Sequence, residues 1–383
     1  MSNQPRARMI YAVPPDHLKQ ENGTSQRLKT LRSALAERFE LEETNLLNQP
    51  LRRRERLAML LISLIGLSNN WRYLALSHRL PPQTDSQLTL LLGNYCACLA
   101  LLAPDKPLML DLVDSLTLTD VRGMQSGWRW RPLIYLAQLP SSWLLEHCLR
   151  RHSQLQAVLI TTEREKAWLE RLHGSWANLH VVPNQVQLQP GFSASPAPRL
   201  QDHGPLQLAF IGSLNWWVNQ VSARRAVRIL ERFLRSPGVN KVVVLNLYGT
   251  ANSSVHLLPK SNCRSLKVVH HGYVEILGCL PGRNHAAFLP NPIGRGFQNK
   301  LLNCVALGLP TIAHVSMSPH QTSEPAPGPV IYCQGQADYD AALLSLWSLT
   351  QDQREAITST SGTYLERFFS STRINRSLGE ALN

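Results

Sequence analysis

Short apolar runs alternate with longer amphipathic stretches along most of the chain. The runs at Met9–Val13, Leu108–Asp114 and Leu155–Ile160 have the length of buried strands, and helix-like segments follow them. The same order returns with the run LQLAFI that begins at Leu206. Regular alternation of strands and helices predicts parallel α/β sheets, and a chain of 383 residues is long enough for two such domains.

One segment near the C-terminus has the pattern of an anion site. An apolar strand, Ala286–Leu289, runs into a loop that contains Gly294 and Gly296, and a helix over Gln298–Leu307 follows and ends at Gly308. A glycine-rich turn before a helix N-terminus presents free N–H groups and a favourable dipole to a phosphate.

Lys300 is one turn inside this expected helix, where its ammonium group can reach the same anion. The alternative is an ordinary strand-to-helix turn in which glycine serves geometry alone. The residues by themselves leave both readings open.

The segment resembles the donor-sugar signature of GT-B glycosyltransferases, in the nucleotide-sugar-dependent retaining group. The matching positions are Pro290, Gly294, Gly296, Lys300, Ala306, Gly308 and Pro310. The family usually has a glutamate that binds the ribose hydroxyls, and Asn303 stands in its place; Arg295 stands where an earlier glutamate is common. An amide still donates and accepts hydrogen bonds, but more weakly than a charged acceptor.

A second segment, Leu206–Leu230, resembles the strand and helix that open the donor domain of this family. Its motif G-S-x-x-W-x-x-N is matched at Gly212, Ser213, Trp216 and Asn219. The basic pair that other members carry here is missing, so Arg224 and Lys300 would supply the positive field. The resemblance implies a donor site formed by Gly212, Ser213, Asn219, Arg224, Gly294, Gly296, Phe297, Gln298, Asn299, Lys300 and Asn303.

The N-terminal half carries weaker matches. Gly23 and Arg27 fit the family's glycine loop and the arginine that follows it on the acceptor side. The alternative interpretation of the same residues is a capped helix with an exposed arginine. Asp114 ends the strand LMLDLVD and resembles a cleft-facing aspartate, while helix capping by Asp114 or Ser115 is the alternative.

Domain boundaries follow from composition and from the resemblance. Residues 1–185 form the expected acceptor-side domain, which ends at a Val-Val-Pro-Asn strand end with Gln185 in place of the usual glycine. Residues 186–205 are rich in Pro, Ser and Gly and read as a linker. Residues 206–363 form the donor domain, and a helix over 364–383 crosses back to the first domain.

The implied activity is a hexosyltransferase of cell-surface polysaccharide or glycoconjugate synthesis. Lys300 and Asp114 are the catalytic candidates, and the nucleotide sugar is a co-substrate. We expect no metal cofactor, because the seven cysteines lack zinc spacing. One alternative is an inactive family member that acts as a binding or scaffold subunit, as Asn303 and Gln185 suggest. The other is a nucleotide-sugar 2-epimerase, which needs more carboxylates near the sugar.

The net charge of +13 concentrates at Arg52–Arg56, directly before LAMLLISLIGL. That stretch is too short to span a bilayer, but a basic helix with an apolar face can lie on anionic lipid, which suits a lipid-linked saccharide acceptor. A solvated arginine cluster beside a core helix is the alternative. No nucleic-acid motif is present. The first thirty residues lack the apolar core of a signal peptide, so we expect a cytoplasmic or peripheral membrane protein.

Overall fold

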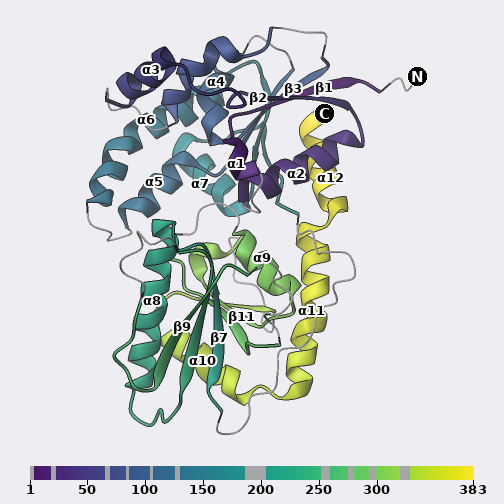
Figure 1. The fold of residues 1–383 in the computed structure, drawn as a ribbon. Helices are drawn as coiled ribbons and strands as arrows, with labels where there is room; N and C mark the ends of the chain where they lie inside the picture. The colour runs from purple at the N-terminus through teal and green to yellow at the C-terminus, as the bar shows by residue number, and fades with distance from the viewer. Residues whose placement is uncertain are drawn as a thin grey trace. The chain divides into compact units, whose positions relative to one another are not determined.

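The computed structural model describes residues 4–18, 23–64, 70–82, 86–103, 107–125, 130–185, 204–251, 259–274, 280, 282–293, 298–319 and 328–383. Its internal contacts divide the chain into two compact units (Figure 1). Unit 1 takes in Met1–Gln185 and Ser370–Asn383, and unit 2 takes in Val186–Gly294 and Gln298–Phe369.

Unit 1 is built on a sheet whose six described strands follow the order β2, β1, β3, β4, β5, β6. The strands are β1 (Arg6–Tyr11), β2 (Glu40–Asn45), β3 (Leu88–Leu92), β4 (Leu108–Val113), β5 (Leu155–Ile160) and β6 (Leu179–Val181). All of these pairings are parallel, so the carboxyl ends of the strands lie along one edge of the sheet.

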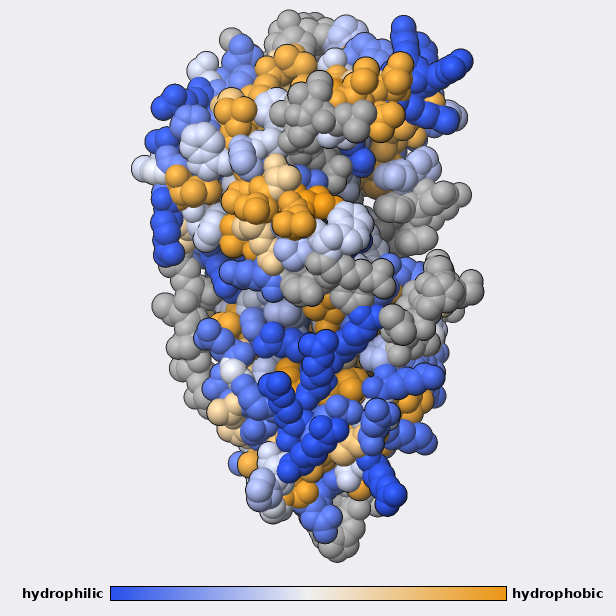
Figure 2. All heavy atoms as spheres, turned by 90° about the vertical axis from the view of Figure 1, so that its left-hand side faces the viewer, coloured by the Kyte–Doolittle hydropathy of each residue, from blue (hydrophilic) through white to orange (hydrophobic). Residues whose placement is uncertain are grey.

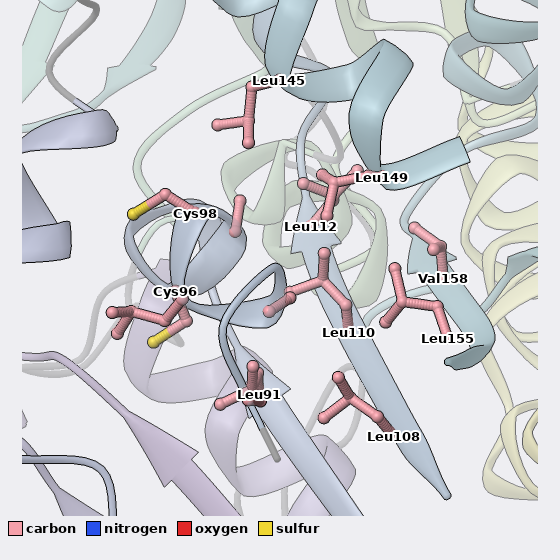
Figure 3. Packing of buried hydrophobic residues seen from close by; sticks show 14 of the residues in the cluster. Leu91, Cys96, Cys98, Leu108, Leu110, Leu112, Leu145, Leu149, Leu155 and Val158 are labelled. Atoms are coloured by element: carbon pink, nitrogen blue, oxygen red, sulfur yellow. The ribbon is translucent and has the colours of Figure 1, made fainter. Parts of the chain in front are cut away.

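Helices cover both faces of this sheet. They are α1 (Pro15–Leu18), α2 (Gly23–Ala36), α3 (Arg53–Leu64), α4 (Ala97–Ala100), α5 (Leu116–Met124), α6 (Arg131–Arg151) and α7 (Glu163–His173), with the 3-10 helices η1 (Trp71–Arg79) and η2 (Asn94–Cys96). Successive side chains of β4 point to opposite faces. Leu110 and Leu112 therefore pack with Leu145 and Leu149 of α6 (Figure 3), while Met109 packs on the face covered by α2.

The end of the chain belongs to unit 1. Helix α11 (Gln351–Phe369) stops at Ser370, whose hydroxyl accepts a hydrogen bond from the Arg373 amide and caps α12 (Ser371–Leu382). Helix α12 contacts α2, β5 and β6, and Ile374 and Leu378 are buried there. The helical segment expected over 364–383 is thus interrupted by a cap at residue 370.

Unit 2 has a second parallel sheet, and its six described strands follow the order β12, β11, β10, β7, β8, β9. The strands are β7 (Leu206–Ile211), β8 (Val243–Tyr248), β9 (Leu266–Gly272), β10 (Ala286–Leu289), β11 (Thr311–His314) and β12 (Val330–Cys333). The helices are α8 (Trp217–Leu234), α9 (Asn299–Ala306), α10 (Gln336–Ser348) and α11, with the 3-10 helix η4 (Val315–Met317).

The core of unit 2 lies between the sheet and helices α8 and α10, where Phe210, Phe233 and Tyr339 are buried. On the other face, α9 packs against α11. The two parallel α/β domains predicted from the alternating pattern are confirmed. Among the described helices, none combines the length and the apolar content that a membrane span requires.

Candidate functional site

Three neighbouring strands of unit 2 bring glycines together at their carboxyl ends. Gly212 follows β7, Gly249 follows β8, and Gly272 ends β9. A Cβ atom on Gly249 would lie 2.2 Å from the Gly212 carbonyl oxygen, closer than any side chain permits. Glycine at position 249 therefore lets the backbone after β7 approach the end of β8 directly.

The turn between β7 and α8 is fixed by side-chain hydrogen bonds. The Ser213 and Thr250 hydroxyls lie 2.7 Å apart, and the Asn219 Nδ2 group donates to the Ser213 carbonyl oxygen at 2.8 Å. A Cβ atom on Gly212 would come within 2.9 Å of the Asn219 amide carbon, so glycine at position 212 leaves room for this amide. The predicted residues Gly212, Ser213 and Asn219 thus form one arrangement.

Lys300 joins the same arrangement from α9. Its ammonium nitrogen lies 3.0 Å from Asn219 Oδ1 and 5.8 Å from the centre of the Phe210 ring. The side chain is half-buried, and this burial lowers the pKa of Lys300 to about 8 from its usual 10.5. No carboxylate of a described residue forms an ion pair with it. The cation is held by a neutral amide at the start of a helix, an arrangement that favours an added anion.

Asn291, which the sequence reasoning missed, organises the backbone between β10 and α9. It is buried, and its Oδ1 atom accepts hydrogen bonds from the Ser222 hydroxyl of α8 and from the Ile293 amide. Its carbonyl oxygen accepts a third bond, from the Ser316 hydroxyl. The available signal was a polar residue two positions after the buried strand β10, because α/β sites form at the edge of the sheet where the strands end.

Four further residues expected in the donor site lie on α8 and at the start of α9. Arg224 lies half-buried on α8, and Asn299 is the first residue of α9. Gln298 precedes that helix without a side-chain capping bond, and its side-chain oxygen accepts a hydrogen bond from Asn291 Nδ2 at 3.4 Å. Asn303, also half-buried, follows Lys300 by three positions, so both lie on one side of α9. Gly294, Gly296 and Phe297 lie outside the described residues.

Unit 1 places Arg27 differently from our expectation that it faces an acceptor. The guanidinium is fully buried and donates to both carboxylate oxygens of Asp111, at 2.7 and 3.0 Å. A third nitrogen bonds the Val182 carbonyl oxygen at 2.6 Å. The face of α2 that packs on the sheet carries Arg27 beside Leu28, so the charge is directed to Asp111 of β4.

Gly23, the other expected acceptor-side residue, is exposed at the first position of α2. Asp114 follows Val113, which has a φ of 62°. The Asp114 amide bonds the Leu112 carbonyl oxygen at 2.6 Å, which closes a γ-turn around Val113. A positive φ at a β-branched residue costs free energy, and such strain concentrates at functional positions.

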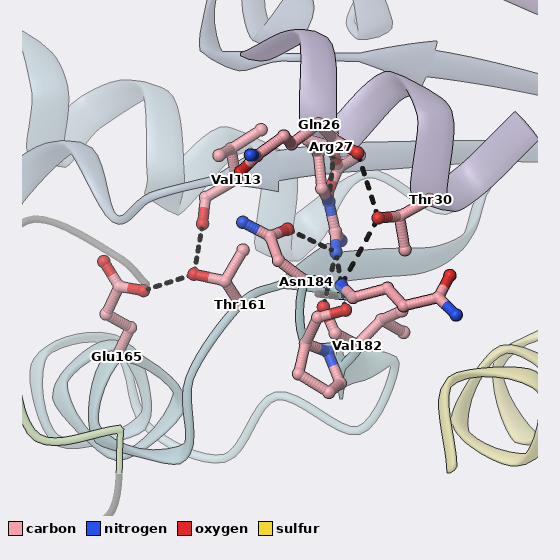
Figure 4. A network of polar contacts seen from close by, with 11 residues as sticks. Gln26, Arg27, Thr30, Val113, Thr161, Glu165, Val182 and Asn184 are labelled. Atoms are coloured by element: carbon pink, nitrogen blue, oxygen red, sulfur yellow. Dashed lines mark hydrogen bonds and ion pairs between the residues drawn. The ribbon is translucent and has the colours of Figure 1, made fainter. Parts of the chain in front are cut away.

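The γ-turn is supported by a polar network at the carboxyl ends of β4 and β5. The Thr161 hydroxyl bonds the Val113 carbonyl oxygen at 3.0 Å and lies 3.3 Å from Glu165 (Figure 4). Burial and the neighbouring charge of Asp114 raise the pKa of Glu165 to about 8. Asp114 is therefore close to a second carboxyl group, and the repulsion between the two charges contributes to the raised pKa of Glu165.

Ser115, not Asp114, caps α5: its hydroxyl accepts a hydrogen bond from the Leu118 amide. The first amides of α5 donate to the buried carboxylate of Glu146, at 2.7 Å from Leu116 and 3.2 Å from Thr117. This helix N-terminus is therefore already occupied by an internal anion. At the start of α9, by contrast, the nearby charged group is the cation Lys300.

No group of three or more His, Cys, Asp or Glu side chains suited to a metal ion occurs within the described parts of the chain. Within α9, burial raises the pKa of the Cys304 thiol to about 12, so this neighbour of Lys300 is neutral.

No protein-family model matches the chain, and no curated protein matches it in sequence. Solved structures do match. Sucrose-phosphate synthase from Thermosynechococcus elongatus has a TM-score of 0.65 at 12% identity, with 98% of each chain covered. Anabaena HepE in complex with UDP and glucose has a TM-score of 0.58 at 12% identity, covering 98% of this chain and 99% of that one.

The lipopolysaccharide outer core galactosyltransferase WaaB has a TM-score of 0.60 at 14% identity, covering 98% of this chain and 99% of that one. The chain spans 58% of the length of TarM, which it matches with a TM-score of 0.51. These likenesses extend over both units. The chain has the GT-B fold of two Rossmann-like domains.

Proposed function

We propose that the protein is a glycosyltransferase that moves a sugar from a nucleoside diphosphate sugar to an acceptor hydroxyl. The observation that carries the proposal is the position of Lys300, an ammonium group without a carboxylate partner among the described residues, 3.0 Å from Asn219 at the start of α9. The GT-B fold and the UDP and glucose bound in HepE support it. We assign the donor to the glycine-lined carboxyl edge of the sheet in unit 2.

In this proposal the diphosphate is the leaving group, and its charge grows as the bond to the sugar breaks. Lys300 and the free amides at the start of α9 stabilise that charge. Asn219 holds the ammonium in place, and the side-chain oxygen of Asn303 accepts hydrogen bonds from the ribose hydroxyls. The nucleotide sugar is the co-substrate, and charge compensation by Lys300 takes the place of a resident metal ion.

We place the acceptor against unit 1, with Gly23 at the start of α2 and Asp114 after the strained Val113. Arg27 supports this region through Asp111 and does not contact the ligand. The acceptor is a saccharide or a lipid-linked saccharide of cell-surface polysaccharide or glycoconjugate synthesis. Arg52–Arg56 contact an anionic membrane from its cytoplasmic side.

The test is nucleotide binding followed by transfer. A panel of nucleoside diphosphates is screened by thermal shift, since a ligand that binds only the folded state raises the melting temperature. Titration calorimetry then compares the parent with Lys300→Ala, Lys300→Arg and the matched control Lys260→Ala, an exposed lysine of unit 2.

We expect Lys300→Ala to weaken binding by about one to two decades, because a charge-assisted hydrogen bond contributes roughly 1.5–3 kcal/mol. Lys300→Arg restores part of the affinity, and Lys260→Ala changes nothing. Sugar turnover without an acceptor indicates an epimerase, and a parent that binds no nucleotide indicates a scaffold subunit. Equal affinities of the parent and Lys300→Ala overturn the assignment of the site.

A further inference from the structure

The outward face of α6 is apolar over three turns. Its buried positions, which include Leu145 and Leu149, pack on the sheet (Figure 3). The exposed positions between 133 and 144 recur every three or four residues and therefore form one stripe. They are Leu133, Leu136, Ala137, Pro140, Trp143 and Leu144. No charged residue interrupts the stripe, although a helix in contact with water normally carries charges on that face.

The exposure of these side chains is high: Leu133 is 69% exposed, Leu136 56%, and Trp130, directly before the helix, 64%. Single exposed leucines are common on soluble proteins, but a continuous apolar stripe marks an interaction surface.

Helix α3 continues this surface with apolar and basic side chains. Leu57, Leu60 and Leu61 are each at least half exposed. The turn before them exposes Arg52, Arg53, Arg54 and Arg56.

Glu55, the acid of this segment, is turned inward. Its carboxylate is buried and pairs with Arg79 at 2.6 Å and His78 at 2.9 Å, and the hydrogen bond from Arg79 lowers the pKa of Glu55 to about 2. Among the described residues, no carboxylate pairs with the four outward arginines. Their charge is therefore fully available to a partner.

The two helices are joined by η1. It packs along α3, and the Trp71 indole N–H donates to the Ser141 carbonyl oxygen of α6 at 3.0 Å. Figure 2 looks onto the side of unit 1 that carries α3 and α6, and hydrophobic side chains gather there in its upper half. We call the stripe of α6, Leu57, Leu60 and Leu61 of α3, and the four arginines the docking surface.

We infer that the docking surface binds an anionic lipid bilayer, with its leucines and Trp143 in the acyl boundary and its arginines against headgroup phosphates. Charge complementarity selects this partner: a second copy of the chain would present the same arginines, whereas an anionic bilayer supplies both phosphates and hydrocarbon. Tryptophan and arginine beside exposed leucines are typical of helices that lie in the membrane interface. This inference extends the proposed membrane contact at Arg52–Arg56 to α6, and it does not depend on nucleotide binding.

Vesicle flotation of the full chain tests the inference. The vesicles are phosphatidylcholine alone or phosphatidylcholine with phosphatidylglycerol. We expect flotation with the anionic vesicles only, and a decrease as salt rises, because the phosphate contacts are screened.

Two sets of variants locate the surface. The triple change Arg53→Gln, Arg54→Gln, Arg56→Gln should weaken binding about a hundredfold, since each basic residue near the membrane contributes about fivefold, or about 1 kcal/mol. Its matched control replaces Arg228 and Arg232 of α8 and Arg235 directly after it, all exposed in unit 2, and should lose much less.

The second set replaces Leu133, Leu136 and Leu144 with glutamine and should weaken binding at least about tenfold. Its control is Leu344→Gln, an exposed leucine of α10. Unchanged melting temperatures show that the variants are folded, and sedimentation velocity measures self-association.

Equal flotation with both vesicle types, no flotation, or equal losses in the variants and their controls overturns the inference. So does a stripe that mediates self-association without vesicle binding. Binding of the same panel of nucleoside diphosphates, measured in parallel, separates the two proposals. Vesicle binding without nucleotide binding removes the proposed sugar transfer alone. Nucleotide binding without vesicle binding removes the docking surface, together with the proposed membrane contact at Arg52–Arg56.

Discussion

The ammonium nitrogen of Lys300 lies 3.0 Å from Oδ1 of Asn219, and the other end of that amide donates to the Ser213 carbonyl oxygen at 2.8 Å. One neutral side chain thus ties the turn after β7 to the first turn of α9. Because an amide carries no net charge, it positions the cation without neutralising it. The field of Lys300 remains available to a diphosphate.

Replacement of Asn219 by aspartate tests that relationship. Asn219→Asp places a carboxylate beside Lys300, so the ion pair should compete with the ligand and weaken nucleoside diphosphate binding by about tenfold or more. Asn219→Ala removes the support but leaves the cation free, and should cost less affinity than aspartate. Calorimetric titration of both variants measures the difference, and an aspartate variant as tight as the parent would contradict the assigned geometry.

The pH dependence of binding follows from the lowered pKa of Lys300, about 8. Nucleotide affinity should fall as the pH rises through about 8, because the ammonium loses its charge. The stability of the free protein should depend on pH in the opposite direction. The unfolded chain holds this proton up to about pH 10.5, whereas the folded chain releases it at about pH 8. The contribution of Lys300 to the free energy of unfolding therefore rises from pH 8 to 10.5. Titrations at several pH values should show a flat profile for Lys300→Ala; the parent profile surviving in that variant would exclude Lys300 as the titrating group.

Asn303 tests the ribose contact. If its amide oxygen accepts hydrogen bonds from the ribose hydroxyls, Asn303→Glu should maintain or tighten the binding of uridine or guanosine diphosphate. A charged acceptor forms a stronger hydrogen bond. Asn303→Gln has a similar size without the charge and serves as the control. Calorimetry decides, and loss of nucleotide binding in the glutamate variant would remove Asn303 from the donor site.

Local signals in the sequence predicted α9 closely. The expected helix, Gln298–Leu307, differs from Asn299–Ala306 by one residue at each end, because Gly308 with its positive φ stops a helix regardless of its surroundings. The contact between Lys300 and Asn219 spans 81 positions, and only the family resemblance brought the two residues together. Asn291 was not predicted for the same reason: its partner Ser222 is 69 positions away, and local patterns do not predict such distant contacts.

The sequence also did not predict which side of a helix packs against the sheet. Arg27 was expected on the acceptor side, with an exposed position on a capped helix as the alternative. Its partner Asp111 lies 84 positions away within an apolar strand. The apolar residues of α6 were equally ambiguous, because a stripe in contact with water and a stripe in the core have the same spacing. Tertiary packing settles both cases, and no local pattern records it.

The buried pair Arg27 and Asp111 should matter for stability. Removal of either partner leaves an unpaired buried charge, so Arg27→Met and Asp111→Leu should each lower the free energy of unfolding by about 3–5 kcal/mol. The double variant should recover much of that loss. Denaturant unfolding measures all three, with nucleotide binding as the control that should stay unchanged. A stable Arg27→Met variant that loses only acceptor binding would return Arg27 to the acceptor side.

Glu165 makes the stability of unit 1 dependent on pH. Its pKa in the folded chain is about 8, above the ordinary 4.5, so the folded state holds a proton that the unfolded chain releases. The stabilising contribution is complete below about pH 4.5 and is lost as the pH rises through about 8.

Glu165→Gln keeps an uncharged acceptor for the Ser115 amide, which donates to this carboxyl group at 3.1 Å. The variant should therefore match the parent at pH 5 and melt at a higher temperature than the parent at pH 8.5. Thermal melts across this range, with the exposed Glu163→Gln as the matched control, measure the effect. Parallel melting curves for the parent and Glu165→Gln at every pH would show that the carboxyl group is ionised throughout, and that its bonds to Thr161 and Thr162 hold a charge and not a proton.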